Sequence, residues 1–290
     1  MDESLSDWLR LREAADWAAR SDELVRRVTA HLGPADPVHV LDLCTGTGSN
    51  LRYLIERLPR RQRWLVIDHD PALLAEVPVR LASWADACGF SAQTSPTGTD
   101  VRGERLDCLV QTAHMNLDAL DAGIFEGRHL VTASALLDLV SEAWLRTLAV
   151  RCRSVGASAL FAITYNGRSS CDPAEPEDDL VRDLFNLHQL RDKGLGGASG
   201  GPAAWAAAER SFTEAGYVVE SAPSDWVLGP NDRQLQQQLI GGWAEAASQT
   251  APERAAAISD WLGRRLQHVD AGRSTVVVGH VDMAAWLEGG

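Results

Sequence analysis

Lysine is almost missing from this chain of 290 residues, which contains Lys193 alone beside 26 arginines. The formal net charge is −13, and no stripe of basic residues occurs along the chain. A nucleic-acid partner requires clustered positive charge to displace counterions from phosphates, so we expect no DNA or RNA partner. The short basic run at 60–63, RRQR, is typical of a solvated turn before a strand.

Cysteine and long apolar runs are also scarce. The five cysteines lie far apart without a CxxC pair, which predicts neither a disulfide framework nor a zinc site. No run of 18 or more apolar residues occurs, so no membrane span is expected. The first 20 residues are charged throughout and lack the apolar segment of a signal peptide. These absences favour a cytoplasmic protein with reduced thiols and no bound metal.

Hydrophobic residues make up 45% of the chain, enough for a full core, and they occur in short runs between helical patterns. Strands alternating with helices predict a doubly wound α/β sheet, mostly parallel and covered on both faces. We expect strands at 38–43, 64–67, 106–113, 130–133, 157–165, 216–221 and 274–281. We expect helices at 5–31, 51–58, from Pro71 onward, and at 134–148, 178–193, 202–215, 231–248 and 252–266, with loops at 93–103 and 166–177 and a glycine-rich hinge at 194–201.

The segment at 40–50, VLDLCTGTGSN, contains the strongest functional signal. Gly46 and Gly48 follow an apolar strand and precede a helix, so backbone amides can face a bound nucleotide closely. A dinucleotide turn requires a third glycine, which allows tight packing of helix on strand, and Leu51 occupies that position. The turn therefore fits NAD or FAD poorly.

Asp42, on the strand four residues before Gly46, completes a pattern that resembles class I (Rossmann-like) S-adenosylmethionine-dependent methyltransferases. The resemblance covers 38–165 at motif level. It implies a seven-stranded sheet whose last strand is antiparallel, and S-adenosylmethionine as the cofactor. Cys44 departs from the glycine that many of these enzymes have there.

The resemblance also implies roles for single residues. Asp42 would help to hold the methionine ammonium, and Asp68 would accept hydrogen bonds from the ribose hydroxyls, with Asp70 a helix N-cap instead. Asn116 and the apolar residue after it would contact adenine. Arg12 and Arg20 are candidates for the cofactor carboxylate, or ordinary surface arginines. The full set of expected cofactor contacts is Asp42, Cys44, Thr45, Gly46, Gly48, Asn50, Asp68, His69, Asn116, Leu117, Ser134, Arg12 and Arg20.

Three further strings resemble a group of bacterial small-molecule methyltransferase-like proteins: LRxxxDxxAR at 11–20, WxxxDxDPxLL at 64–74 and FNxHQxxDKG at 185–194. On this basis we expect an N-terminal helical lid at 1–33 and a Rossmann-like domain at 34–290. That domain would carry a cap insertion at about 166–215 and a helical insertion at about 229–270.

The acceptor side is expected at the carboxyl ends of the strands, beneath the helix at 178–193. The polar stripe of that helix fits a cap over the acceptor, or simply a solvated face. The candidates for contact with the substrate are Tyr165, Asn166, Asn186, Gln189 and Lys193. The candidate bases are His188, Tyr165 and Asp138, because an oxygen or nitrogen nucleophile must lose a proton. Trp226 is a pocket wall or plain core.

The function expected from these patterns is transfer of a methyl group from S-adenosylmethionine to an oxygen, nitrogen or carbon of a small molecule. The transfer would be an in-line displacement, in which positioning supplies most of the rate. Two alternatives remain open: an enzyme that uses the same cofactor for lyase or alkyl-transfer chemistry, and a non-catalytic cofactor-binding protein. The sequence does not indicate an oligomeric state.

Overall fold

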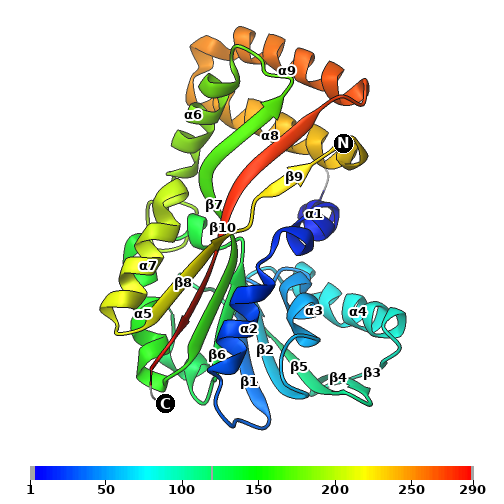
Figure 1. The fold of residues 1–290 in the computed structure, drawn as a ribbon, viewed down its shortest axis with the longest axis vertical. Helices are drawn as coiled ribbons and strands as arrows, with labels where there is room; N and C mark the ends of the chain where they lie inside the picture. The colour runs from blue at the N-terminus through cyan, green and yellow to red at the C-terminus, as the bar shows by residue number, and fades with distance from the viewer. Residues whose placement is uncertain (1–3, 119, 289–290) are drawn as a thin grey trace.

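The computed structural model describes residues 4–118 and 120–288, whose strands form a ten-stranded sheet flanked by helices (Figure 1). The strands are β1 (Val38–Leu43), β2 (Arg61–Asp68), β3 (Ser91–Ser95), β4 (Gly98–Gly103), β5 (Leu106–His114), β6 (Leu130–Ser134), β7 (Ser158–Asp172), β8 (Val218–Pro223), β9 (Trp226–Leu228) and β10 (Thr275–Trp286). The helices are α1 (Leu5–Ala19), α2 (Asp22–Ala30), α3 (Ser49–Ile55), α4 (Pro71–Ala87), α5 (Glu142–Val155), α6 (Asp178–Gln189), α7 (Ala204–Glu214), α8 (Arg233–Thr250) and α9 (Ala255–Asp270).

The strand order confirms the predicted fold class. The order is β3-β4-β5-β2-β1-β6-β7-β10-β8, with β9 paired to β10. The central strands β5, β2, β1, β6 and β7 run parallel, whereas β10 is antiparallel to both β7 and β8. The order reverses between β1 and β6, so the crevice at the carboxyl ends of these strands is the expected ligand site.

Two apolar cores cover the two faces of the sheet. One contains α5 and α7 side chains packed on residues such as Val131 and Phe161. The other contains side chains of α2, α3 and α4 packed on residues such as Val40 and Trp64. Because both faces are buried, the central strands are almost continuous apolar runs, as parallel strands usually are. Within the described ranges, no helix is both long enough and apolar enough to cross a bilayer.

A third core lies beyond the end of the parallel sheet, where β7 and β10 continue together (Figure 1). This part, called the cap here, consists of residues 165–172 of β7 and 275–280 of β10 with β9, α6, α8 and α9. Its apolar side chains include Tyr165, Val181, Trp243, Trp261 and Val276. Trp8 and Leu11 of α1 pack against the same core. The cap therefore stands over the carboxyl ends of the central strands.

The structure differs from the sequence expectations in several segments. Residues 93–103, expected as a loop, belong largely to the β3–β4 hairpin, whose β3 lies at the sheet edge with polar side chains that hide its strand character. Residues 166–172, also expected as a loop, continue β7 because β10 pairs with them. Helix α5 begins at Glu142, where Ser141 caps it, not at 134. Within the segment predicted as a cap at 166–215, α6 packs in the third core and α7 packs on the sheet.

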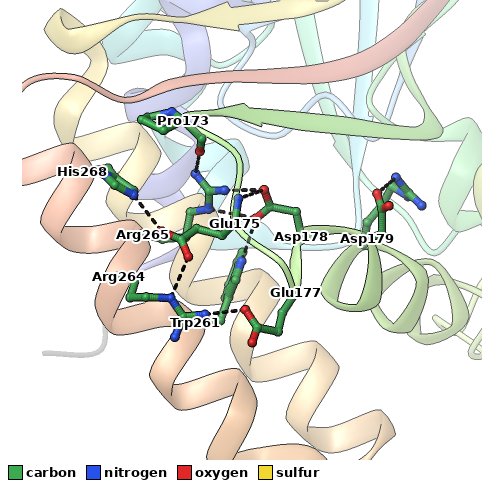
Figure 2. Close-up of polar contacts among 10 residues, drawn as sticks. Pro173, Glu175, Glu177, Asp178, Asp179, Trp261, Arg264, Arg265 and His268 are labelled. Carbon is green, nitrogen blue, oxygen red and sulfur yellow. Dashed lines mark hydrogen bonds and ion pairs between the residues drawn. The ribbon is translucent and has the colours of Figure 1, made fainter.

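A buried ion pair attaches α6 to α9 (Figure 2). The Arg265 side chain is fully buried and donates to both carboxylate oxygens of Asp178 and to the carbonyl of Pro173. Trp261 Nε1 also donates to Asp178, at 2.7 Å. Around this pair, Arg264 binds Glu175 and Glu177, and His268 lies 2.8 Å from Glu175. These contacts set the position of the first turn of α6, and so of the helix that borders the cavity described below.

Replacement of Arg265 by Met is expected to lower the free energy of unfolding by about 3 kcal/mol, because it removes a fully buried cation and leaves the partly buried Asp178 carboxylate without it. Arg233→Met is the control, since Arg233 and Asp270 form an exposed pair that contributes less than about 1 kcal/mol. Urea denaturation of the two variants measures the difference. Equal losses would contradict the structural role assigned to the buried pair.

Candidate functional site

Three neighbouring strands reach the same level of the sheet with a non-glycine residue in the left-handed region. Cys44 after β1, Ala135 after β6 and Ile163 within β7 have φ angles of 50°, 53° and 55°. This conformation is uncommon for such residues and strained for a β-branched side chain, so surrounding contacts must hold it. Asp282 supplies one such contact, because its Oδ1 accepts from the Ile163 amide at 2.8 Å.

These three residues line one cavity of about 960 Å³. Its walls come from α1, the glycine turn, the ends of β2, β5 and β6, and the cap. Ligand pockets usually measure about 300–1,000 Å³, so this cavity lies at the upper end of that range. It has room for a nucleotide-sized ligand together with a second small molecule.

A buried network under the glycine turn sets the shape of the turn. Asp42 accepts from Thr45 Oγ1 and from Asn50 Nδ2, both at 2.6 Å. Asn50 Nδ2 also contacts Thr132 Oγ1, which joins β6 to the network. Burial raises the pKa of Asp42 to about 6, and the two hydrogen bonds oppose that rise. Asp42 does not itself line the cavity, so its effect on a ligand passes through Thr45 and Asn50, which do.

Asp68 holds the same turn from the end of β2. Its Oδ2 accepts from the Gly46 amide at 2.7 Å, and its Oδ1 accepts from the Asp70 amide at 3.0 Å. Asp68 lines the cavity, and so does His69, whose Nδ1 lies 3.2 Å from Asp68 Oδ1. Asp70 caps α4 through the amides of Ala72 and Leu73, as expected from the sequence.

Helix α1 lies across the turn. A Cβ atom built on Gly46 would be 3.0 Å from Leu9 Cδ1, Trp17 Nε1 donates to Ser49, and Arg52 pairs with Glu13 at 2.6 Å. One face of α1 borders the cavity with Leu5, Trp8, Leu9, Arg12 and Asp16. The N-terminal helix therefore covers the donor end and the cap end of the cavity together.

The two candidate arginines of the N-terminal region occupy different places. Arg12 lines the cavity, forms a bidentate pair with Asp16 at 3.0 Å, and lies over the Trp226 ring at 4.9 Å. Arg20 is buried behind the turn, donates to Asn50 Oδ1 at 2.5 Å, and lies over the Tyr53 ring. Arg20 does not line the cavity.

Of the remaining residues expected to contact the cofactor, some line the cavity and others lie behind its wall. Asn116 and Ser134 line the cavity, and Asn116 Oδ1 also accepts from the Asp118 amide at 3.1 Å. Leu117 is buried and its carbonyl accepts from Trp144 Nε1. Gly48 has a φ of 79° and borders Val77 and Arg52 on the far side of the turn.

Among the acceptor-side candidates, Tyr165 lines the cavity and Asn186 supports it from behind. The Tyr165 hydroxyl donates to Asn186 Oδ1 at 2.8 Å, and Asn186 Nδ2 donates to the Gly167 carbonyl. Burial raises the pKa of Tyr165, so its phenol stays protonated. Asn166 accepts from the Arg168 amide and lies beside Gly279, away from the cavity. Gln189 and Lys193 border the cavity, Lys193 with an exposed side chain.

His188 does not border the cavity, contrary to the expectation for a base. Its Nε2 lies 3.1 Å from Gln249 Oε1, so the ring faces α8. Asp138, just after β6, borders the cavity with 8% of its surface exposed. Burial raises the pKa of Asp138 to about 6. Of the three candidate bases, Asp138 alone combines access to the cavity with a group that can accept a proton near neutral pH.

Comparisons with known proteins give similarity in fold only. No protein-family model and no curated protein matches the sequence. Among solved structures, a methyltransferase-like protein from Bacillus halodurans matches with a TM-score of 0.48 and 13% identity, over 92% of this chain and 99% of that one. A methyltransferase from Thiobacillus denitrificans in complex with S-adenosylhomocysteine has a TM-score of 0.43 and 14% identity, over 98% and 99%. A cyclopropane synthase from Mycobacterium tuberculosis has a TM-score of 0.43 and 11% identity, over 90% and 82%.

The chain has the Rossmann-like methyltransferase fold. Its strand order establishes this, with a parallel core and the antiparallel β10 between β7 and β8.

Many residues that border the cavity are not among those expected from the sequence, and several of them are aromatic. Trp8, Phe185, Trp243 and His280 border the cavity beside Tyr165 and Trp226. They come from α1, α6, α8 and β10, and no spacing along the chain brings them together. His280, a lone imidazole within an apolar strand, was the one visible signal. Among residues 4–118 and 120–288, no three His, Cys, Asp or Glu side chains gather as a metal site.

His280 should make stability fall in mild acid. Burial, together with the nearby Arg12, lowers the pKa of His280 to about 3, whereas the pKa of a histidine in an unfolded chain is about 6.5. The unfolded chain therefore binds more protons between these values, and the free energy of unfolding falls as pH drops below 6.5. His280→Phe should lose about 2 kcal/mol less than the parent between pH 6.5 and 5. Urea titrations at both pH values test this, and parallel losses in the two proteins would contradict it.

Proposed function

We propose that this chain binds S-adenosylmethionine at the glycine turn and transfers its methyl group to a small molecule held under the cap. The observation that carries the proposal is the single cavity, which joins the turn at Gly46 and Asp68 to a covered chamber over the strand ends. A donor and an acceptor bound in one cavity can be aligned without free diffusion, which is the main requirement of methyl transfer.

The donor end offers a group for each part of the cofactor. The side chains of Thr45 and Asn50, which Asp42 holds, border the space proposed for the methionine moiety. The Asp68 carboxylate keeps free lone pairs toward the cavity, which suit ribose hydroxyls. Asn116 offers an amide to adenine. Cys44, Ser134 and Ala135 border the space between these groups and the cap, where the sulfonium would lie.

The reaction forms a bond from the acceptor atom to the methyl carbon and breaks the bond from that carbon to sulfur, whose electron pair stays on S-adenosylhomocysteine. When the acceptor is a hydroxyl or an ammonium, its proton must also leave. Asp138 is the proposed base. Tyr165 holds a phenol proton that Asn186 already accepts, so we assign Tyr165 to positioning.

Cofactor binding tests the donor site. Gly46→Val should lower the affinity for S-adenosylmethionine at least tenfold, because the new side chain enters the space between the turn and Leu9. Gly127→Val is the matched control, since Gly127 has a similar φ of 66° and no atom within 4 Å of a built Cβ. Isothermal titration calorimetry measures both affinities. Equal affinities in the two variants would remove the turn from the site.

Asp68→Ala gives a second, independent test of the donor site. Loss of the carboxylate releases the Gly46 amide and removes the ribose acceptor, so the affinity for S-adenosylmethionine should fall at least tenfold. Asp70→Ala removes a helix cap instead and should cost about 1 kcal/mol of stability with unchanged affinity. An unchanged affinity in Asp68→Ala would overturn the ribose assignment.

The pH profile of turnover tests the base. With a hydroxyl or amine acceptor, kcat/KM should rise with pH through about 6, because only the ionised Asp138 accepts a proton. Asp138→Asn should lose this rise and about 100-fold or more in kcat. His188→Asn is the control and should keep the parent profile, since His188 lies outside the cavity. Formation of S-adenosylhomocysteine is the readout, and methylthioadenosine in its place would contradict methyl transfer.

A further inference from the structure

The cap end of the cavity contains a continuous array of aromatic rings. The ring centroids of Trp226 and His280 lie 5.0 Å apart, and those of His280 and Tyr165 lie 6.1 Å apart. The rings of Tyr165 and Phe185 meet edge-on, with centroids 5.6 Å apart. Phe185 in turn lies 6.2 Å from Trp243. Trp8 of α1 completes the lining. We call the space bordered by these six side chains the acceptor chamber. Such walls favour a flat apolar molecule, since ring contacts contribute beyond the area that they bury.

The rings come from separate elements that the fold brings together above the sheet. Trp226 is on β9, His280 on β10, Phe185 on α6 and Trp243 on α8. These elements gather around the outer ends of β7 and β10 (Figure 1). The buried pair of Arg265 and Asp178 holds the first turn of α6, and so the Phe185 wall, in place. The chamber is therefore a built site and not a gap between loosely packed helices.

The charges that border the chamber are already compensated. The Arg12 guanidinium binds both carboxylate oxygens of Asp16, and Trp226 Nε1 donates to the same carboxylate at 3.1 Å. Arg12 also lies over the rings of Trp226 and Trp8, at 4.9 and 6.0 Å. The faces of Trp226 and Trp8 thus already hold a cation, the Arg12 guanidinium.

The six side chains that define the chamber carry no charge themselves. Burial keeps the pKa of His280 low, so its imidazole is neutral and offers one donor and one acceptor nitrogen. Asp138 carries the remaining negative charge beside the expected position of the sulfonium. Arg12 and Asp16 pair with each other, and Asp138 lies beside the expected position of the sulfonium, so an ionised acceptor would lie among uncharged rings. Burying its charge unpaired would be costly.

We infer that the acceptor is an uncharged aromatic molecule with a hydroxyl group, held flat between the rings of the acceptor chamber. This inference rests on the proposed function, because it names the substrate class of the same cavity. In the reaction the hydroxyl oxygen forms the bond to the methyl carbon, and its proton passes to the Asp138 carboxylate. The methyl–sulfur bond breaks and its electron pair remains on sulfur, so the step needs no further reactant.

A panel of three probes of one shape tests the class by charge alone. The full chain, saturated with S-adenosylhomocysteine, is titrated by calorimetry with 2-naphthol, 2-naphthoate and 2-naphthylmethylammonium. We expect 2-naphthol to bind at least tenfold more tightly than either charged probe. Tighter binding of the carboxylate, tighter binding of the ammonium, or binding of none of the three would overturn the inference.

Variants locate the binding in the chamber. Trp8→Ala removes a half-buried ring on α1 and should weaken 2-naphthol at least tenfold, whereas Trp226→Phe keeps a ring and should change its affinity less than threefold. Trp84→Ala is the control, since Trp84 packs in the core formed by α2, α3 and α4 and should leave binding unchanged. Equal affinity in Trp8→Ala and the parent would place the probe elsewhere and overturn the inference.

The same instrument separates this inference from the proposed function. Binding of 2-naphthol to a chain that binds neither S-adenosylmethionine nor S-adenosylhomocysteine would support the chamber and refute the methyltransferase proposal. Tight binding of S-adenosylmethionine without binding of 2-naphthol would support the donor site of the proposed function and refute the inference about the acceptor.

Discussion

The Asp282 carboxylate is the contact on which the geometry of this site depends. One oxygen accepts from the amide of Ile163, where β7 turns into the left-handed region, and the other accepts from the amide of Ser21, between α1 and α2. The side chain is almost fully buried on β10. A single acidic residue thus stabilises the strained point of β7 and fixes where the N-terminal helices meet the sheet. Ile163 borders the cavity, and so does one face of α1, the helix that precedes Ser21.

The strained point divides one long strand pair into two working parts. Before Ile163, β7 belongs to the parallel sheet and pairs with β6, whose carboxyl end borders the cavity. After Ile163, β7 and β10 continue as an antiparallel ribbon that carries the cap, with irregular pairing between Val278 and His280. Register shifts of this kind bend a pair of strands and change the direction in which its side chains point. Tyr165 and His280 therefore face the cavity and not a second sheet face.

Much of the donor side could be predicted from the sequence, because its determinants are local. The glycines of the turn, the acid before them and the acid after β2 occur at short, fixed spacings, and they lie together as expected except that Asp42 and Gly48 stand behind the cavity wall. The acceptor side could not be predicted in this way. In the segment 178–193, the polar Gln189 and Lys193 border the cavity, but so does the apolar Phe185, whereas His188 faces α8.

The sequence by itself determined the alternation of strands and helices, the parallel core and the nucleotide turn. Each of these depends on local apolar periodicity or on the backbone freedom of glycine at one place. Only the tertiary structure decided where β7 ends, that α7 covers the sheet, and that six aromatic side chains from α1, α6, α8 and three strands surround one space. Those outcomes depend on strand pairing and side-chain packing between segments far apart in the chain, and no local pattern records them.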